Sequence, residues 1–190
     1  MPLNLEPVVS ALWISLGVFW TAGALGAKPA RLHEPPVASV LHLAVLVLSF
    51  GLVFKRSFRP GPLNAFFLAP TPASQWTGLA LTAAGIGIAV LARVILGRNW
   101  SGTVTVKRDH QLIRRGPYAV VRHPIYSGLA LALFGTAVFH ARVGSLAGFA
   151  LALLNWRLKS LAEEAFMERE FGADYAEYKR RVKALIPLVW

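Results

Sequence analysis

Long apolar stretches are the feature that most constrains how this chain of 190 residues can fold. A helix needs about 20 apolar residues to cross roughly 30 Å of hydrocarbon. A hydrophobic fraction of 55% with only 15% charged residues is also atypical of a soluble domain. Five stretches carry almost no charge, the last being the shortest: residues 8–27, 37–54, 76–97, 125–141 and 143–156. The pattern predicts an all-α integral membrane protein.

The last two stretches are short for membrane spans, and only residues 140–142 separate them. We therefore expect a short antiparallel helical hairpin, which either spans the membrane or dips in and returns. In both cases the polar loop before the hairpin, 98–124, and the tail after it, 157–190, lie on the same side of the membrane. With the hairpin counted as two crossings, the chain has about five transmembrane helices.

Lysine and arginine counts predict which side this is, because positively charged loops are retained in the cytoplasm. If the tail is inside, 15 of the 20 basic residues lie in inner segments and 4 lie in outer ones. Basic loops beside anionic lipid explain the net charge of +11, and no nucleic-acid motif accompanies it. We expect the chain to interact with the lipid bilayer and not with nucleic acid. We also expect its functional site to face the cytoplasm.

Polar content divides the chain unevenly. Residues 1–75, two helices and a Pro-rich connection, hold nearly no candidate chemistry and are interpreted as a transmembrane scaffold. Residues 76–190 form the predicted core, with three helices, the polar loop and the tail. Within the loop, residues 104–106 suit a brief extended segment. Acidic and aromatic residues are interleaved in the tail, which predicts a juxtamembrane amphipathic segment of two helices broken at Gly172.

The sequence GPYAVVRHPIYSG, 116–128, places a polar cluster directly before the fourth apolar stretch. Proline disfavours helix at the residue before it and fits the first helical turn, so we expect a helix to begin at Pro124. The unpaired amides of a helix start suit a carboxylate or a phosphate. Anchoring of Arg122 and His123 at the lipid headgroups explains the same residues equally well.

A second polar cluster, WRLKSLAEEAF at 156–166, follows the last apolar stretch. Lys159 and Glu163 are four residues apart, so on a helix they share a face and can contact one ligand. The competing explanations are a capping box from Ser160 to Glu163 and an ordinary surface pair. A capping box would require the helix to restart at Ser160, and the sequence shows no break there.

Together these clusters carry a resemblance to a known family. HQLIRRGPYAVVRHPIYSG at 110–128, the paired glutamates at 163–164 and FGADYAEYKRRV at 171–182 occur in that order over roughly the C-terminal half. In this the chain resembles the isoprenylcysteine carboxyl methyltransferase family and its phospholipid methyltransferase relatives. The resemblance implies an integral membrane methyltransferase that uses S-adenosylmethionine.

The resemblance also implies site residues. Lys159 and His123 are the candidate catalytic residues, and Lys159 stands where the carboxyl methyltransferases have an arginine that contacts the substrate. Lysine lacks the bidentate fork of arginine, which puts recognition of a prenylcysteine carboxylate in doubt. By motif, the cofactor-binding positions are His110, Gln111, Leu112, Ile113, Tyr118, His123, Pro124, Ile125, Tyr126, Glu163 and Glu164.

These residue types are compatible with S-adenosylmethionine. Glu163 can pair with its ammonium, the helix start at Pro124 with its carboxylate, and Leu112, Ile113 and the tyrosines with its flat or apolar parts. Methyl transfer is an in-line displacement, so the site must mainly position the acceptor and exclude water. An ammonium acceptor would have to lose a proton, and His123 is then the first candidate for a general base.

The acceptor stays open: a carboxylate, a thiol or an amine on a lipophilic or small molecule all fit, and membrane burial favours a lipophilic one. Oligomeric state is open too. Two alternatives remain, an NADPH-dependent reductase of the sterol reductase type and a non-catalytic membrane scaffold. The full RHPxYxG and EE pattern, with no dinucleotide glycine motif, argues against the reductase.

Other polar or small residues are given structural explanations. Arg93, near the end of the third stretch, can snorkel or face the bundle. His42 and His140 have no partners at ligand spacing and the chain has no cysteine, so we expect no metal site. The GxxxG match at 144–148 predicts close helix packing, within the hairpin or between protomers.

Overall fold

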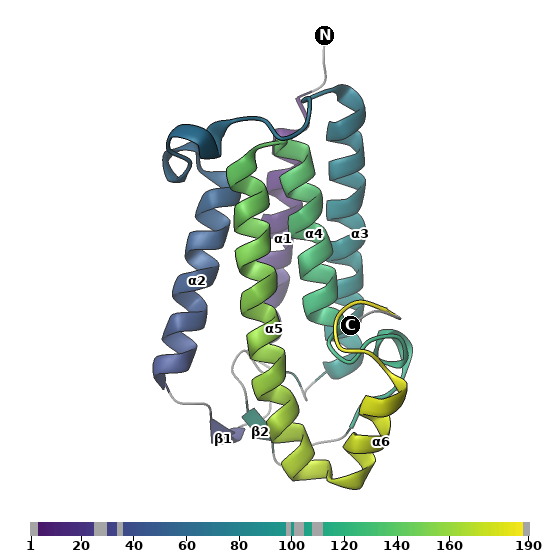
Figure 1. Cartoon of the computed structure of the whole chain (residues 1–190). Helices are drawn as coiled ribbons and strands as arrows, with labels where there is room; N and C mark the ends of the chain where they lie inside the picture. Colours follow the sequence, from purple (N-terminus) through teal and green to yellow (C-terminus); the bar gives the residue numbers. More distant parts are fainter. Residues whose placement is uncertain are drawn as a thin grey trace.

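The computed structural model describes residues 4–24, 30–33, 36–97, 100, 105–107 and 112–187. These residues form five long helices that run side by side, with a sixth, short helix at one end (Figure 1). The helices are α1 (Glu6–Ala24), α2 (Pro36–Phe54), α3 (Pro72–Leu96), α4 (Pro124–His140), α5 (Val143–Phe171) and α6 (Ala173–Arg181). The predicted helical membrane fold is thus observed as a helix bundle.

Two of the helices, Val37–Phe54 and Pro72–Leu96, are each long and apolar enough to cross a bilayer, and Pro124–His140 is apolar but shorter. The outward face of α2 fits such a setting, because large apolar side chains are exposed along it: Val37, Val40, Leu41, Leu43, Val47 and Leu48. A row of exposed aliphatic side chains this long on one helix suits contact with lipid rather than with water.

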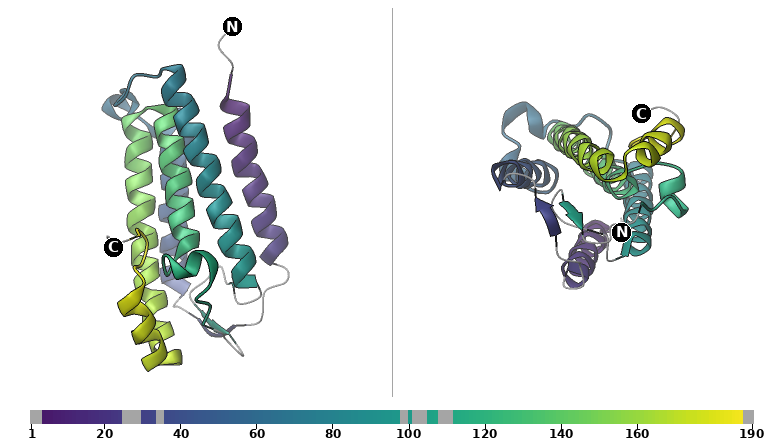
Figure 2. Two further views of the ribbon diagram at one scale, coloured as in Figure 1. Left: turned by 90° about the vertical axis from the view of Figure 1, so that its right-hand side faces the viewer. Right: turned by 90° about the horizontal axis from the view of Figure 1, so that it is seen from below.

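The chain is not purely helical. Strands β1 (Ala30–His33) and β2 (Thr105–Lys107) pair antiparallel, with Leu32 opposite Val106. The extended segment expected at residues 104–106 is therefore present, shifted by one residue, whereas its partner strand was not predicted. Figure 2 shows both strands, residues 112–123 of the polar loop and α6 at the same end of the bundle. The pairing ties the connection after α1 to the polar loop.

Glycines let α3 and α4 touch backbone to backbone. A Cβ added to Gly128 would lie 2.6 Å from Ala89 N and from Gly85 O, and one added to Gly135 would lie 2.5 Å from Thr82 N. At this contact the hydroxyl of Thr82 lies 3.1 Å from that of Thr136. Small residues are favoured in membrane helix pairs because they permit such close van der Waals contact.

Within the chain, the GxxxG glycines of α5 pack against α2 and the connection that follows it, not against α4 as in a hairpin. A Cβ at Gly148 would lie 2.6 Å from Ser49 O on α2, and one at Gly144 would lie 2.6 Å from Cγ of Arg59. The predicted close packing is found, but its partners are α2 and the connection that follows it. Long-range contacts of this kind cannot be assigned from spacing alone.

Helix α5 corrects the predicted hairpin and tail. It is one continuous helix of 29 residues, so the predicted end of the fifth helix at residue 156 is wrong. No cap forms at Ser160, whose hydroxyl donates to Arg157 O inside the helix. The predicted break at Gly172 is confirmed: this glycine has φ +49° and separates α5 from α6. The tail is therefore an extension of α5 followed by α6.

Arg93 has a structural role at the polar end of α3. Its guanidinium donates to Gly97 O at 2.9 Å and to Gly23 O at 2.8 Å, and it lies 4.3 Å from the ring centre of Trp100. The carbonyls at the last turns of α1 and α3 lack helical partners, and a cation there suits the helix dipoles. Arg93 therefore faces the bundle and joins two helix ends.

Candidate functional site

The site is built where α4 begins, at the end of the bundle that carries the strands and α6. The loop before α4 and the chain after α6 lie together there, as predicted from the hairpin (Figure 1). The amides of Arg122 and His123 donate to the carbonyls of Lys183 and Ala184, at 2.8 and 3.0 Å. The Ser127 hydroxyl donates to Leu185 O at 2.5 Å. We name residues 182–187 the C-terminal strap.

The strap changes one expectation about the helix start. Pro124 is the first residue of α4, as predicted. The preceding amide, that of His123, already donates to the strap and Pro124 has no N–H, so these positions offer no amide to an anion. The expected carboxylate contact at the helix start therefore loses its first donors.

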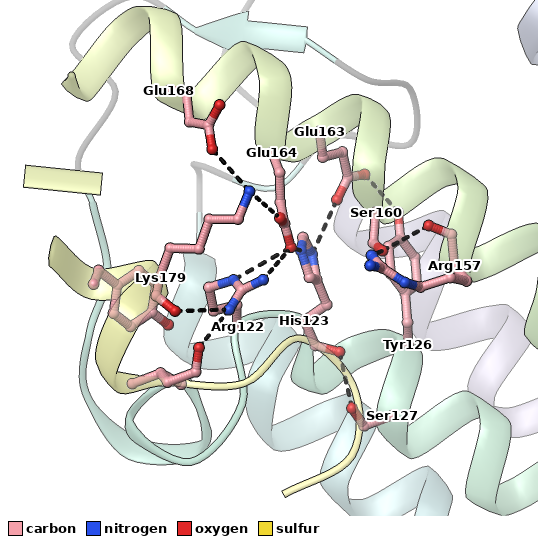
Figure 3. A network of polar contacts seen from close by, with 12 residues as sticks. Arg122, His123, Tyr126, Ser127, Arg157, Ser160, Glu163, Glu164, Glu168 and Lys179 are labelled. Carbon is pink, nitrogen blue, oxygen red and sulfur yellow. Dashed lines mark hydrogen bonds and ion pairs between the residues drawn. The ribbon is translucent and has the colours of Figure 1, made fainter. Parts of the chain in front are cut away.

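Two adjacent glutamates of α5 approach the start of α4 (Figure 3). The Tyr126 hydroxyl donates to Glu163 Oε1 at 2.5 Å, and His123 Nδ1 lies 3.4 Å from Glu163 Oε2. The other ring nitrogen, His123 Nε2, lies 3.1 Å from Glu164 Oε1. The imidazole thus bridges two carboxylates, one on each side.

Glu164 is further bound by two cations. Arg122 Nη2 lies 2.6 Å and Lys179 Nζ 3.1 Å from its carboxylate oxygens (Figure 3). The side chains of Glu164 and Arg122 are 3% and 7% exposed, whereas that of Glu163 is 25% exposed. Burial with several charge-assisted partners indicates a structural role for Glu164, and it leaves Glu163 as the carboxylate that a ligand can reach.

The pKa values follow from these contacts. Burial opposes the charge on His123, but hydrogen bonds to Glu163 and Glu164 outweigh it and raise the pKa of the imidazole. Burial also opposes the charge on Glu163, yet the contacts with His123 and Tyr126 lower the pKa of that carboxyl. For Glu164, the bonds from His123 and Arg122 overcome burial and lower the pKa to about 2. The cluster favours an imidazolium between two carboxylates.

Aromatic rings form a wall beside the carboxylates. The rings of His123 and Tyr126 stack with centroids 5.9 Å apart, and Tyr126 stacks on Trp156 at 6.5 Å. Lys159, one turn before Glu163 on α5, contributes a positive charge that favours ionised Glu163. Two turns of α5 and the first turn of α4 therefore bring together three kinds of group: aromatic rings, a carboxylate that a ligand can reach, and a lysine.

The other predicted cofactor residues differ in burial, and two of them lie outside the described residues. Tyr118 and Ile125 are buried in one apolar cluster with Ala92, and Ile113 packs against that cluster. The Tyr118 carbonyl accepts a hydrogen bond from the Tyr178 hydroxyl at 2.5 Å, which attaches α6 to the loop. Leu112 is half-buried. His110 and Gln111 lie outside the described residues.

The roles of three residues of the cluster were not predicted from the sequence: Arg122 as the partner of Glu164, Lys179 of α6, and Trp156. Arg122 was visible in the RHP motif and Lys179 in YKRRV, but nothing in the sequence pairs either with Glu164, 42 and 15 positions away. A pocket of about 520 Å³ was also missed. It lies on another face of α4 and is lined almost wholly by apolar side chains, among them Val120, Leu131, Phe134, Phe149 and Ile186.

Comparison with known proteins decides the family. The family model described as phospholipid methyltransferase matches residues 73–174, more than half of the chain. The chain belongs to the phospholipid methyltransferase family. The match runs from α3 through the polar loop and the paired glutamates to the start of α6, so it contains the described cluster except Lys179.

Relatives within the phospholipid methyltransferase family are named isoprenylcysteine methyltransferases. Protein-S-isoprenylcysteine O-methyltransferase B of Arabidopsis thaliana is 26% identical over 169 residues, covering 86% of this chain and 82% of the relative. A probable protein-S-isoprenylcysteine O-methyltransferase of Oryza sativa subsp. indica is 32% identical over 152 residues, covering 76% of each. The resemblance inferred from the motifs is confirmed, and the chain is an integral membrane methyltransferase.

The fold has a counterpart among solved structures. The structure of the eukaryotic intramembrane Ras methyltransferase, an isoprenylcysteine carboxyl methyltransferase, matches with a TM-score of 0.56 and 24% identity. The match covers 78% of this chain, which spans about half, 53%, of that chain. At this identity the likeness establishes the fold of the phospholipid methyltransferase bundle and nothing finer.

Proposed function

We propose that this protein transfers a methyl group from S-adenosylmethionine to a lipophilic acceptor, at the cytoplasmic face of a membrane. The observation that carries the proposal is the cluster in which His123 and Tyr126 at the start of α4 orient Glu163 of α5. Its residues are those of the motif shared with the family. They lie at the junction of membrane and solvent that a lipophilic acceptor and a water-soluble cofactor both need to reach.

The residues present fit the cofactor. Both oxygens of Glu163 are engaged, but a carboxylate can accept about four hydrogen bonds, and the side chain is 25% exposed. Glu163 would hold the ammonium group, and the rings of Tyr126 and Trp156 offer π faces to a sulfonium. Leu112, Ile113 and Pro124, with His110 and Gln111 by resemblance, would contact the adenosine part. Bound S-adenosylmethionine supplies a methyl group on a positively charged sulfur.

The roles of the other residues follow from their contacts. We assign Glu164 to positioning, since it holds Arg122, His123 and Lys179 together, rather than to cofactor contact. Both ring nitrogens of His123 face carboxylates, so the imidazole is better suited to orienting Glu163 than to acting as a free base. Lys159 would contact the acceptor as a point charge, one turn further into the membrane than Glu163.

We further propose that all five long helices cross the membrane, with α5 extending beyond it on the cytoplasmic side. Basic residues are concentrated at the end of the bundle that carries the site, as retention of positive loops requires. The first two helices would then be the scaffold and residues 76–190 the methyltransferase core.

Ligand-induced stabilisation tests this function. We expect S-adenosylhomocysteine to raise the apparent melting temperature of the detergent-purified protein, because a ligand that binds only the folded form stabilises it. Glu163→Gln should raise at least tenfold the ligand concentration that gives a half-maximal shift. Glu170→Gln, which changes an exposed glutamate of the same helix, should leave that concentration unchanged. A shift with NADPH alone would favour a reductase, and no shift with either ligand would favour a scaffold.

A further inference from the structure

His42 is the one titratable residue of α2, a helix otherwise made of apolar and small residues. Its Nδ1 lies 2.7 Å from Oδ1 of Asn155 on α5, and Asn155 is only 4% exposed. An ionisable side chain inside the apolar part of a membrane protein is costly, and such residues are retained mainly where they act on a substrate, an ion or a proton. The pair therefore calls for an explanation beyond packing.

The hydrogen bond determines which ring nitrogen of His42 is available. An amide oxygen only accepts, so Nδ1 carries the proton and Nε2 of the neutral ring keeps a lone pair. The amide nitrogen of Asn155 points to the backbone carbonyl of His42 at 3.5 Å, which supports this orientation of the amide. Nε2 makes no hydrogen bond with any residue that the structure describes.

Asn155 places this pair beside the proposed methyl-transfer site. Asn155, Lys159 and Glu163 recur every four residues, so they share one face of α5 and are spaced by about 6 Å along its axis. The residue after Asn155, Trp156, stacks on Tyr126, whose hydroxyl binds Glu163. His42 therefore lies one turn further into the membrane than Lys159, where the reacting end of a lipophilic acceptor would enter.

Among the described helices that pack around this position, few other charged side chains occur. Helix α5 carries Lys159 and Glu163 on this face, and α4 contributes the Tyr126 hydroxyl. In α1 the one acidic or basic residue is Glu6, which pairs with His140 at the opposite end of the bundle.

We propose that His42 accepts the proton of the methyl acceptor, with Asn155 positioning its ring, and that the acceptor is a lipophilic thiol or amine. The inference rests on the proposed function. A bond forms between the acceptor sulfur or nitrogen and the methyl carbon, while the bond from that carbon to the sulfonium breaks and its electron pair stays on sulfur. The acceptor proton moves to Nε2 of His42 and then to water. A carboxylate acceptor would have no proton to give.

The test compares acceptors of equal chain length, an alkyl thiol, an alkyl amine and an alkyl carboxylate, on the full chain in nanodiscs with S-adenosylmethionine. His42→Asn keeps a donor near the Nδ1 position and removes Nε2. We expect kcat/KM with the thiol and the amine to fall about 100-fold, in the range for loss of a general base. The melting shift with S-adenosylhomocysteine should be unchanged. His140→Gln, at the far end, serves as the matched control and should keep full activity.

The pH profile separates proton transfer from a structural effect. With the amine, wild-type activity should fall as pH drops and the imidazole takes up a proton, and His42→Asn should lack that limb and recover only at high pH. The proposal would be overturned if His42→Asn methylated the thiol and the amine as fast as the wild type does. It would also be overturned if the wild type methylated only the carboxylate. Absence of S-adenosylhomocysteine binding to the wild type would instead refute the proposed function.

Discussion

Glu163 and Glu164 are neighbours in sequence, yet the helix gives them different environments. Successive residues of an α-helix point about 100° apart. One carboxylate therefore faces Tyr126 and stays partly exposed, while the other is enclosed by Arg122, His123 and Lys179. At the scale of single residues, the site consists of one carboxylate that a ligand can reach and a second that holds the surrounding elements in place.

Removing the partner of the buried carboxylate should destabilise the protein. Arg122→Ala leaves Glu164 enclosed and less well compensated, which costs on the order of 3 to 5 kcal/mol for buried pairs. The measurement is the free energy of unfolding in mixed detergent micelles. Arg180→Ala, an exposed arginine of α6, is the control and should change stability by less than about 0.5 kcal/mol. Equal effects of the two variants would contradict the role of Glu164.

The charge state of the cluster predicts a pH dependence. The pKa of His123 is raised above 6.5, so its contribution to stability is complete below that pH and is lost as pH rises through the raised value. The pKa values of the two glutamates are lowered from 4.5, that of Glu164 to about 2, so their contribution is complete above 4.5 and lost on acidification. Stabilisation should therefore be greatest between about pH 4.5 and 6.5.

Melting temperatures of the wild type and His123→Gln across pH check this expectation. The difference in melting temperature between the wild type and His123→Gln should be largest in that pH window and should decrease as pH rises above it. A margin that grows as pH rises would mean that His123 is held neutral. His140→Gln, whose histidine lies at the other end of the bundle, controls for a general effect of removing an imidazole.

At the scale of elements, the α3–α4 contact supports the site, since α4 supplies His123 and Tyr126 from its start. The contact relies on glycines because any Cβ there meets the backbone of the other helix. Helix α5 supplies Trp156 and both glutamates, and because it continues without a break past residue 156, Asn155, Lys159 and Glu163 keep one register. The strap then attaches the chain end to the first turn of α4.

A glycine substitution tests the helix contact. In Gly78→Ala the new Cβ would lie 2.5 Å from Phe139 N, so α3 and α4 must separate and stability should fall by about 1 to 3 kcal/mol. Gly87→Ala on the same helix meets nothing within 4 Å and should be neutral or stabilising by up to about 1 kcal/mol. Unfolding in mixed micelles compares the two. A neutral Gly78→Ala would show that the helices are not in backbone contact.

At the scale of the whole molecule, the bundle has two chemically different ends. The end with the site carries the strands, residues 112–123 of the polar loop, α6 and the strap (Figure 2). The opposite end holds the turn between α4 and α5, where Arg142 lies 3.5 Å from the ring centre of Phe66. Because basic residues favour the first end, we expect it to face the cytoplasm.

Cysteine labelling tests this orientation, since the chain has no cysteine of its own. Glu170→Cys marks the end with the site and Arg56→Cys marks the opposite end; both positions are exposed. In intact cells a membrane-impermeant maleimide should label Arg56→Cys at least tenfold more than Glu170→Cys. Permeabilised cells provide the control, with both labelled. The reverse pattern in intact cells would place the site outside.

Much of this architecture was determined by the sequence itself. Apolar runs, Pro124 and Gly172 act locally, through the cost of placing polar groups in lipid and through the φ/ψ values each residue allows, so the helices, the start of α4 and the break before α6 could be predicted. The motif residues and the family could be recognised for the same reason, because they are properties of the chain order.

Only the tertiary structure decided which of these residues meet. His123 and Glu164 are 41 positions apart, His42 and Asn155 113 apart, and Gly148 packs on α2 rather than on α4. Such pairings depend on how helices approach and rotate, which is set by the packing of many side chains at once and leaves no local signal. That is why the sequence predicted two polar clusters, while the fold decided which carboxylate is buried and which a ligand can reach.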